Sequence, residues 1–439
     1  MPKQNTSIPF LTQTPSRSPH PLAGGRDRQA GAGNPVRSLY LHVPFCFHKC
    51  HYCDFYSLVD TRDRQAAFTD RLIAELHTLA PFSAGAPLRT IFVGGGTPSL
   101  LAVEQWRRLL TTLDERFDLS DIRRGLGEFT VECNPETVSP ELMATLRSGG
   151  VDRVSVGAQS FNPVHLKTLE RWHDPANVPK AIDLARAAGI PRQSMDLIFG
   201  IPGQTLADWE SDLTTALSIG TEHLSCYNLT YEPNTAMTKR LELGHFIPAE
   251  EEVEVEMFHA TLRHVRAAGM DRYEVSNFAK PGCESQHNLA YWRQEEWLAA
   301  GPSASGHVAG WRWKNVPRLD DYLNVQTPDL RSPEGPGQTT PGAPGLPPAI
   351  DVEPPDPTRA LVEKIMTGVR LAEGLDAAAA IAEADRLRPG SGQKLQAAAQ
   401  SSIAAGELVE TAGRWSLTDE GWLVTNRVVL GLVEAVDPD

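Results

Sequence analysis

Six short apolar segments, each followed by an amphipathic stretch, organise the chain between residues 38 and 268. The apolar segments are rich in β-branched residues and lie at 38–43, 90–94, 129–133, 153–157, 194–200 and 223–229. Helical spacing follows them at 62–80, 103–117, 139–148, 162–172, 176–188, 205–219 and 250–268. Strand–helix alternation with continuously apolar strands is typical of a parallel sheet covered by helices. Because such crossovers are right-handed, the pattern predicts an α/β fold with an open or partial (β/α)6 barrel.

Composition divides the 439 residues into four parts. Residues 1–36 are rich in Ser, Pro, Gly and Arg, which predicts a disordered tail. Residues 37–325 contain the barrel and its extension. Residues 326–357 hold ten Pro and four Gly, which indicates a linker or a disordered insertion. Residues 358–439 predict helices, a hairpin and a final helix, as in a small winged-helix-like domain.

Charge and hydropathy exclude several classes of function. The net charge is −14, and residues 358–439 hold 8 basic against 12 acidic residues, a net of −4. Nucleic acid is therefore a poor partner, because phosphate contacts supply most of its affinity. No apolar run approaches the roughly 18 residues of a membrane span. Six cysteines in a chain this long do not resemble a disulfide framework, so the sequence predicts a reducing, cytoplasmic location.

Three of the cysteines, Cys46, Cys50 and Cys53, are clustered in the run LHVPFCFHKCHYCDF. Thiolate sulfur favours iron–sulfur clusters, zinc or Cu(I), and a structural zinc site normally has four ligands. A four-iron cluster held by three cysteines would keep one iron open to another ligand. Two alternatives stay open. One is a helical cysteine stripe, and the other is a zinc site completed by one of four neighbours: His42, His48, His51 or Asp54.

Polar or glycine-rich residues lie at or near the ends of five predicted strands. They are the cysteine run, the GGGTP run at 94–98, Glu132 with Asn134, Gln159, and Asp196. Ligands of parallel α/β folds bind beyond the carboxyl ends of the strands, so we expect these groups at one rim. Glycine lets the backbone approach a ligand closely. Glu132 suits an ammonium group and Arg171 a carboxylate, although either can equally be a surface charge. Asp196 needs a hydroxyl or an arginine partner inside its apolar strand.

The run HNLAYW at 287–292 combines an imidazole with two aromatic rings. Histidine is a common axial ligand of heme iron, and Tyr and Trp offer flat faces to a macrocycle. A packed aromatic cluster with a satisfied histidine is the alternative interpretation. His42, His48 and His51 are alternative ligands.

Taken together, these residues resemble the radical S-adenosylmethionine superfamily over residues 38–320. The C-x₃-C-x₂-C loop followed by GGGTP carries that resemblance. It implies a [4Fe–4S] cluster on Cys46, Cys50 and Cys53, with S-adenosylmethionine (SAM) chelating the open iron. Matching positions in the coproporphyrinogen-oxidase-like branch contact SAM, and here they are Tyr40, Tyr52, Gly95, Gly96, Thr97, Glu132, Gln159, Arg171 and Asp196.

Within that branch the sequence resembles the HemW-type heme chaperones. The oxygen-independent coproporphyrinogen III oxidases carry another cysteine two residues after the third, where this chain has Phe55. The chaperones show YCDF there and share the HNxxYW motif, which implies heme contact by His287, Asn288, Tyr291 and Trp292. The run VEKIMTGVRLAEGLD at 362–376 also resembles the chaperones.

Three functions are therefore compared. The first, which we favour, is a heme chaperone that delivers heme to an acceptor protein and uses the cluster site for regulation or transfer. The second is a radical enzyme with coproporphyrinogen dehydrogenase-like activity, which Phe55 and HNLAYW disfavour. The third is a radical RNA-modifying enzyme, which the acidic charge disfavours. The heme-chaperone function is compatible with a homodimer and with peripheral contact between the chain and membrane-bound heme proteins.

Overall fold

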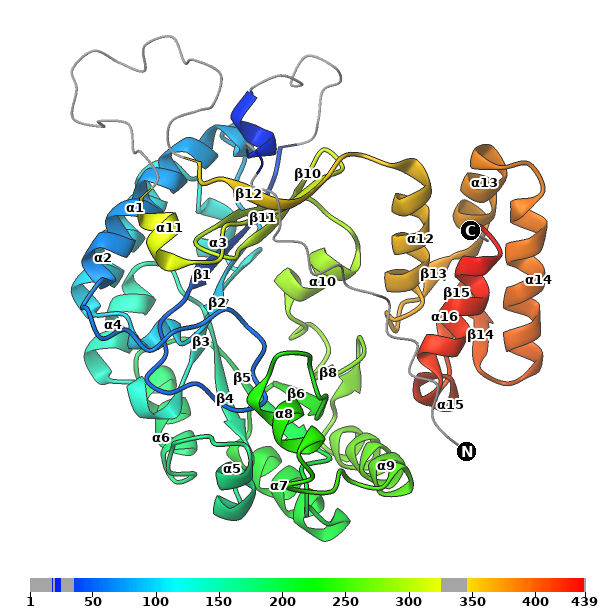
Figure 1. Cartoon of the computed structure of the whole chain (residues 1–439), viewed down its shortest axis with the longest axis horizontal. Coiled ribbons are helices and arrows are strands. Elements are labelled where there is room, and N and C mark those ends of the chain that lie inside the picture. Colours follow the sequence, from blue (N-terminus) through cyan, green and yellow to red (C-terminus); the bar gives the residue numbers. More distant parts are fainter. Residues whose placement is uncertain (1–17, 19, 25–34, 325–345, 438–439) are drawn as a thin grey trace.

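A sheet of six parallel strands in chain order forms the centre of the computed structural model (Figure 1), which describes residues 18, 20–24, 35–324 and 346–437. The six strands are β1 (Ser38–Val43), β2 (Thr90–Gly95), β3 (Glu128–Cys133), β4 (Arg153–Gln159), β5 (Arg192–Phe199) and β6 (His223–Asn228). Each pairs in parallel with the next. This arrangement confirms the predicted α/β partial barrel.

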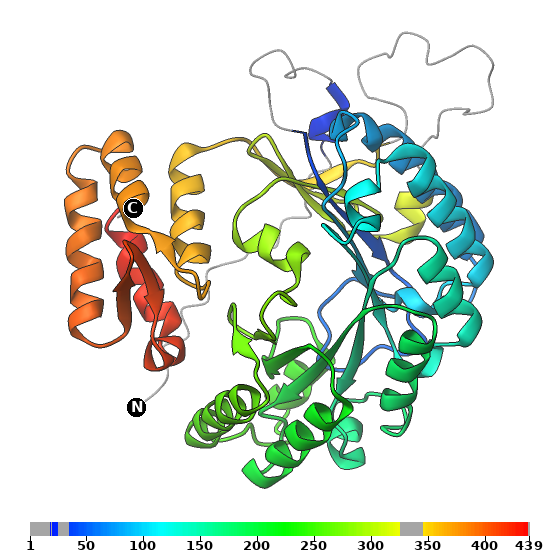
Figure 2. The ribbon, with the colours of Figure 1, turned by 180° about the vertical axis from the view of Figure 1, so that it is seen from behind.

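Helices cover the outer face of the curved sheet (Figures 1 and 2). They are α1 (Gln65–Leu79), α2 (Val103–Arg116), α3 (Ser120–Arg123), α4 (Pro140–Ser148), α5 (Pro163–Thr168), α6 (Asn177–Ala187), α7 (Leu206–Ile219) and α9 (Glu251–Ala267), while α8 (Ala236–Glu242) lies against the loop that follows β1. Their apolar sides pack on the sheet, with Trp106 of α2 and Trp209 of α7 fully buried. Local sequence defines several helix starts. Thr205, for example, forms a reciprocal capping box with Asp208 at the start of α7.

Further strands extend the sheet on both sides. β7 (Asp271–Arg272) and β8 (Asn277–Ala279) lie beyond β6, with β8 antiparallel to it. On the other side β9 (Trp297–Ala300) runs parallel to β1, and three strands follow it: β10 (Ser305–Val308), β11 (Trp311–Asn315) and β12 (Ala349–Glu353). β12 lies in the range 326–357, for which the sequence predicted a linker. Residues 326–345 of that range are outside the described residues.

Two short helices belong to this extension: α10 (Gln286–Trp292) and α11 (Leu319–Leu323). In the N-terminal range 1–36, a short 3₁₀ helix forms at Pro21–Gly24, and Ser18 pairs with Ala349 of β12. The other residues of the range, except 20, 35 and 36, lie outside the described part of the chain.

The C-terminal residues form a module with its own core of buried side chains. Its helices are α12 (Pro357–Gly368), α13 (Ala377–Leu387), α14 (Ser391–Ala404), α15 (Asp419–Leu423) and α16 (Thr425–Glu434). Its small antiparallel sheet contains β13 (Leu375–Asp376), β14 (Leu408–Thr411) and β15 (Arg414–Leu417). The hairpin and the helices match the predicted winged-helix-like pattern, while β13 was not expected.

Ion pairs join this module to the barrel. Arg266 of α9 donates to both carboxylate oxygens of Asp419, at 2.8 and 2.9 Å, and Arg293 donates to both oxygens of Glu373. The Ala372 N–H also donates to the Tyr273 carbonyl. Figures 1 and 2 show the module standing beside the barrel next to α10. None of the described helices is long and apolar enough to cross a membrane.

A buried carboxylate fixes α10 against the sheet. Glu128 of β3 accepts hydrogen bonds from the backbone N–H groups of Gln286 and His287 and from the Ser285 hydroxyl. It also accepts a hydrogen bond from the Thr130 hydroxyl and pairs with the equally buried Arg153, at 3.1 Å. These partners, together with Arg192, hold the pKa of Glu128 below its usual value although burial opposes this. The start of the HNLAYW run is therefore attached to the core by one side chain.

We predict that Glu128→Ala lowers the free energy of unfolding by about 3–5 kcal/mol, because it leaves Arg153 buried without its carboxylate. Chemical denaturation of the purified chain measures this. Glu104→Ala, which removes an exposed carboxylate 3.6 Å from Arg107, is the matched control and should change the value by less than about 0.5 kcal/mol. Equal effects of both substitutions would contradict the role given to Glu128.

Candidate functional site

The three clustered cysteines lie on a loop that leaves the carboxyl end of β1. The loop is attached at several points: the Cys46 N–H donates to Leu58, the His51 N–H to Leu169, and the Met237 N–H to the His51 carbonyl. These bonds connect the loop to itself, to the end of α5 and to the start of α8. All three thiols are partly exposed, and all three line one cavity of about 590 Å³.

The glycine run after β2 packs directly on this loop. The Gly96 N–H donates to the Val43 carbonyl at 2.8 Å, and the Thr97 N–H donates to the Phe45 carbonyl at 2.7 Å. A Cβ on Gly96 would lie 2.7 Å from that Phe45 oxygen, so only glycine allows this approach. The Thr97 hydroxyl in turn reaches the Cys46 sulfur at 3.5 Å. The GGGTP run therefore shapes the cysteine loop as well as the cavity.

Two carboxyl groups face the cavity from neighbouring strands. Glu132 of β3 accepts a hydrogen bond from the Gly95 N–H at 3.2 Å, and Asp196 of β5 accepts one from the Ser155 hydroxyl. Burial and the nearby Asp196 raise the pKa of Glu132 to about 8. Burial also raises the pKa of Asp196, although Ser225 and Ser155 partly oppose this. Among the described residues, no Lys, Arg or His forms an ion pair with either carboxyl group, so a positively charged ligand would relieve the repulsion between the two.

Arg171 supplies the cationic side of the cavity. Its guanidinium donates to the Gly157 carbonyl at 3.0 Å and approaches the Cys50 sulfur at 3.8 Å. Gln159 ends β4 with a φ of 62°, next to a bulge that turns its side chain into the cavity. Tyr52 packs at the same wall, and burial raises its pKa well above the usual value.

The cavity brings together most of the residues that the sequence singled out. Its walls contain Cys46, Cys50, Tyr52, Cys53, Gly95, Gly96, Thr97, Glu132, Gln159, Arg171 and Asp196. Tyr40 does not line it. The Tyr40 ring stacks on Phe92 and His287 instead, and its hydroxyl is hydrogen bonded to His42 at 3.0 Å. Phe55, two residues after Cys53, is 60% exposed at the cavity wall.

The geometry does not favour a single zinc ion at the cysteines. Within the described ranges, no group of three or more His, Cys, Asp or Glu side chains is arranged to hold one metal ion. His42 is hydrogen bonded to Tyr40 and to the Tyr56 carbonyl, and burial lowers its pKa to about 4. His48 stacks on Trp172, with ring centroids 4.4 Å apart. A four-iron cluster binds its cysteines through different iron atoms, so its ligands lie farther apart than those of one ion.

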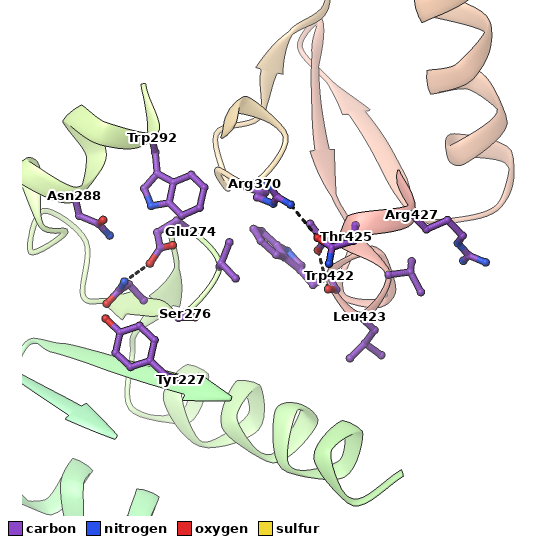
Figure 3. A pocket seen from close by; sticks show the side chains of 14 residues that line it. Tyr227, Glu274, Ser276, Asn288, Trp292, Arg370, Trp422, Leu423, Thr425 and Arg427 are labelled. Atoms are coloured by element: carbon purple, nitrogen blue, oxygen red, sulfur yellow. Dashed lines mark hydrogen bonds between the residues drawn. The ribbon is translucent and has the colours of Figure 1, made fainter. Parts of the chain in front are cut away.

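The HNLAYW run is not at this cavity. His287 of α10 is 1% exposed, with Nδ1 hydrogen bonded to the Thr90 hydroxyl at 2.8 Å and Nε2 buried without a partner. Tyr291 packs edge-on against His287 and tilts against Trp297. Asn288 and Trp292 point the other way and line a second cavity, of about 760 Å³, between the barrel and the C-terminal module (Figure 3).

Several residues that line the two cavities, or that hold a residue lining them, were not identified from the sequence. Ser155 and Ser225, which are hydrogen bonded to Asp196, lie on predicted strands, where their alternation with apolar neighbours was the available signal. Tyr227, Val275 and Ser276 line both cavities and so form a shared wall. Arg370 and Trp422 reach the second cavity from the C-terminal module, and no local pattern could have paired them with α10.

Comparison with known proteins agrees with this geometry. The family model of the radical SAM superfamily matches residues 40–216, which contain the cysteine loop, the GGGTP run and both carboxyl groups. The fold and this match define a radical SAM protein.

Proteins of similar sequence identify the family within the radical SAM superfamily. The heme chaperone HemW of Bacillus subtilis (strain 168) is 37% identical over 290 residues, which cover 66% of this chain and 76% of that protein. The heme chaperone HemW of Escherichia coli (strain K12) is 33% identical over 400 residues, covering 90% and 97%. The chain therefore belongs to the HemW family. The solved coproporphyrinogen III oxidase HemN of Escherichia coli, a radical SAM enzyme, has the same fold, with a TM-score of 0.74 over 92% of both chains at 21% identity.

We predict that Gly96→Ala lowers the free energy of unfolding by about 1–3 kcal/mol, because the new methyl group collides with the Phe45 carbonyl. Thermal and chemical denaturation of the metal-free chain measure the change. Gly431→Ala is the control: a Cβ there meets nothing within 4 Å in helix α16, so it should stabilise the chain by about 0.5–1 kcal/mol. A neutral effect of Gly96→Ala would contradict the close packing of the two loops.

Proposed function

We propose that this chain is a heme chaperone that carries a [4Fe–4S] cluster with exchangeable SAM, binds heme and transfers it to an acceptor protein. The observation that supports this most strongly is the convergence of three thiols and eight further predicted residues on one cavity. The membership of the HemW family supports the heme function, since the relatives are named heme chaperones.

The donor set fits a cluster on Cys46, Cys50 and Cys53. Burial raises the pKa of Cys46 and raises that of Cys53 to about 11, so a bound cation is needed to keep these sulfurs deprotonated. The Thr97 hydroxyl and the Arg171 guanidinium already approach two of the sulfurs. A cluster held by three cysteines would supply one iron open to the amino and carboxylate groups of SAM.

The remaining cavity residues fit a ligand with the charges of SAM. Glu132 and Asp196 form a pair of carboxyl groups without a cation, which suits the ammonium group and the ribose hydroxyls. Arg171 suits the carboxylate because its planar guanidinium can donate twice. Gly95 and Gly96 line the same cavity, and the Gly95 N–H donates to Glu132. Tyr40 would support these residues without touching the ligand, since its ring packs on Phe92 rather than in the cavity.

Phe55 favours the chaperone over oxidative decarboxylation. An exposed phenyl ring lies where the oxidases carry a further cysteine, and a phenyl ring offers no thiol for proton or hydrogen transfer. The likeness to the solved oxidase concerns the fold. The cytoplasmic location, the homodimer and the contact with membrane-bound heme proteins belong to the same proposal.

For heme contact we propose the residues of the HNLAYW run, which differ in how directly they can reach the heme. Asn288 and Trp292 already face a cavity. His287 and Tyr291 would reach heme only after a movement of α10, because His287 is packed against Phe92 with ring centroids 5.3 Å apart.

Anaerobic reconstitution with iron and sulfide, followed by addition of heme, tests this function. We expect about four irons per chain, together with a heme absorption band at one heme per chain. A variant with Cys46, Cys50 and Cys53 replaced by Ala is the control and should lose the iron.

Two outcomes would overturn the proposal. A chain that takes up four irons but shows no heme absorption is not a heme chaperone. Turnover of coproporphyrinogen III to a vinyl product would establish the oxidase function instead.

A further inference from the structure

The second cavity has the chemistry of a site for a flat, anionic ring system. It lies between the barrel and the C-terminal module, and indole rings enter it from both: Trp292 from α10 and Trp422 from α15 (Figure 3). Both side chains are partly exposed. Aromatic faces on two sides favour a large conjugated ligand, because stacking adds to the burial of apolar area.

One wall of this cavity carries a positive charge that is not neutralised. Arg370, just beyond α12, donates to the Met366 carbonyl and to the Asn426 side-chain oxygen, both neutral groups. It forms no ion pair with any described residue. Burial lowers the pKa of Arg370, and no carboxylate opposes this. A carboxylate of a bound ligand would provide the partner that the guanidinium lacks.

The other charged groups at the cavity already have partners, so Arg370 is the group that would bind a ligand carboxylate. Arg427 at the edge is already paired with Glu407 at 2.5 Å. Glu274, at the opposite wall, is buried, hydrogen bonded to the Asn277 side chain, and has a raised pKa because of that burial. Its carboxyl group is directed at an amide rather than at the guanidinium. The cavity thus has an arginine without an ion-pair partner on the side of the C-terminal module, and on the opposite wall a carboxyl group that accepts a hydrogen bond from Asn277.

The contacts between the C-terminal module and the barrel also determine where Trp292 and Trp422 lie at the cavity, and the space between their indole rings is called the slot. The Trp422 ring packs on the Arg272 guanidinium carbon at 4.8 Å, and the ion pairs of Arg266 and Arg293 flank this contact. The floor is the wall of Tyr227, Val275 and Ser276, whose other side belongs to the cysteine cavity. A ligand in the slot would therefore lie next to the cluster site.

We propose that the heme of the proposed function is held in this interdomain cavity, with its ring between Trp292 and Trp422 and a propionate on Arg370. The inference rests on the proposed function and assigns its cargo to a site that includes the C-terminal module. None of the described residues lining the cavity is His, Cys or Met. The cargo is held there by its ring faces and its carboxylates, which suits a protein that must release heme to an acceptor.

Absorbance titration of the cluster-loaded full chain tests this assignment, with heme and heme dimethyl ester as probes. Arg370→Gln should raise the dissociation constant for heme about tenfold, the size expected for one charge-assisted hydrogen bond. The ester should bind the unaltered chain about tenfold more weakly than heme, and Arg370→Gln should weaken it no further. Trp292→Ala should weaken both probes several-fold, because it removes one ring face.

Arg370→Lys should recover part of the heme affinity. Arg386→Gln, on an exposed arginine of α13, is the matched control and should bind heme as the unaltered chain does. Thermal unfolding of each variant separates binding from misfolding.

The titration distinguishes a failure of the proposed function from a failure of the proposed heme site. If the unaltered chain binds no heme, the proposed function fails. If it binds heme and Arg370→Gln binds it equally well, or if heme and its ester bind alike, the interdomain site is wrong while the chaperone function stands.

Discussion

The close contact between the β1 loop and the β2 loop is the constraint on which the cysteine cavity depends. Two backbone hydrogen bonds, from Gly96 to Val43 and from Thr97 to Phe45, continue the parallel pairing of β1 and β2 beyond the strands themselves. They hold the segment that leads into Cys46 against the floor of the cavity. The absence of a Cβ at Gly96 makes this possible.

The rest of the site follows from the order of the strands. Because β1 to β6 are parallel and adjacent in chain order, their carboxyl ends deliver a cysteine loop, a glycine loop, two carboxyl groups and a bulged glutamine to one rim. Tyr227, the next-to-last residue of β6, also faces the interdomain cavity. The two cavities therefore share a wall.

Much of the barrel could be predicted from the sequence because its strands are continuously apolar and its helices are amphipathic. The same local signals predicted the residues at the strand ends. The strands from β7 to β12 were missed, since they are two to five residues long and depend on pairing partners far along the chain. Tyr40, which was predicted to contact SAM, shows the same limit, because its ring lies against Phe92 and His287 and does not line the cysteine cavity. The heme contact predicted for His287 stays a prediction.

The interdomain cavity could not be predicted for a related reason. Trp292 and Trp422 are separated by more than a hundred residues, and their approach depends on the docking of the C-terminal module through Arg266, Arg272 and Arg293. No spacing or periodicity encodes such a contact. The sequence signal in the module, the run at 362–376, marked the segment that holds Arg370 without indicating what it faces.

The central claim is that the three cysteines hold a cluster with one iron open to SAM. Mössbauer spectroscopy of the chain reconstituted with ⁵⁷Fe, before and after addition of SAM, measures this directly. We expect the signal of one iron in four to change on addition of SAM, while the other three keep their parameters. A spectrum in which SAM leaves all four irons unchanged would contradict it.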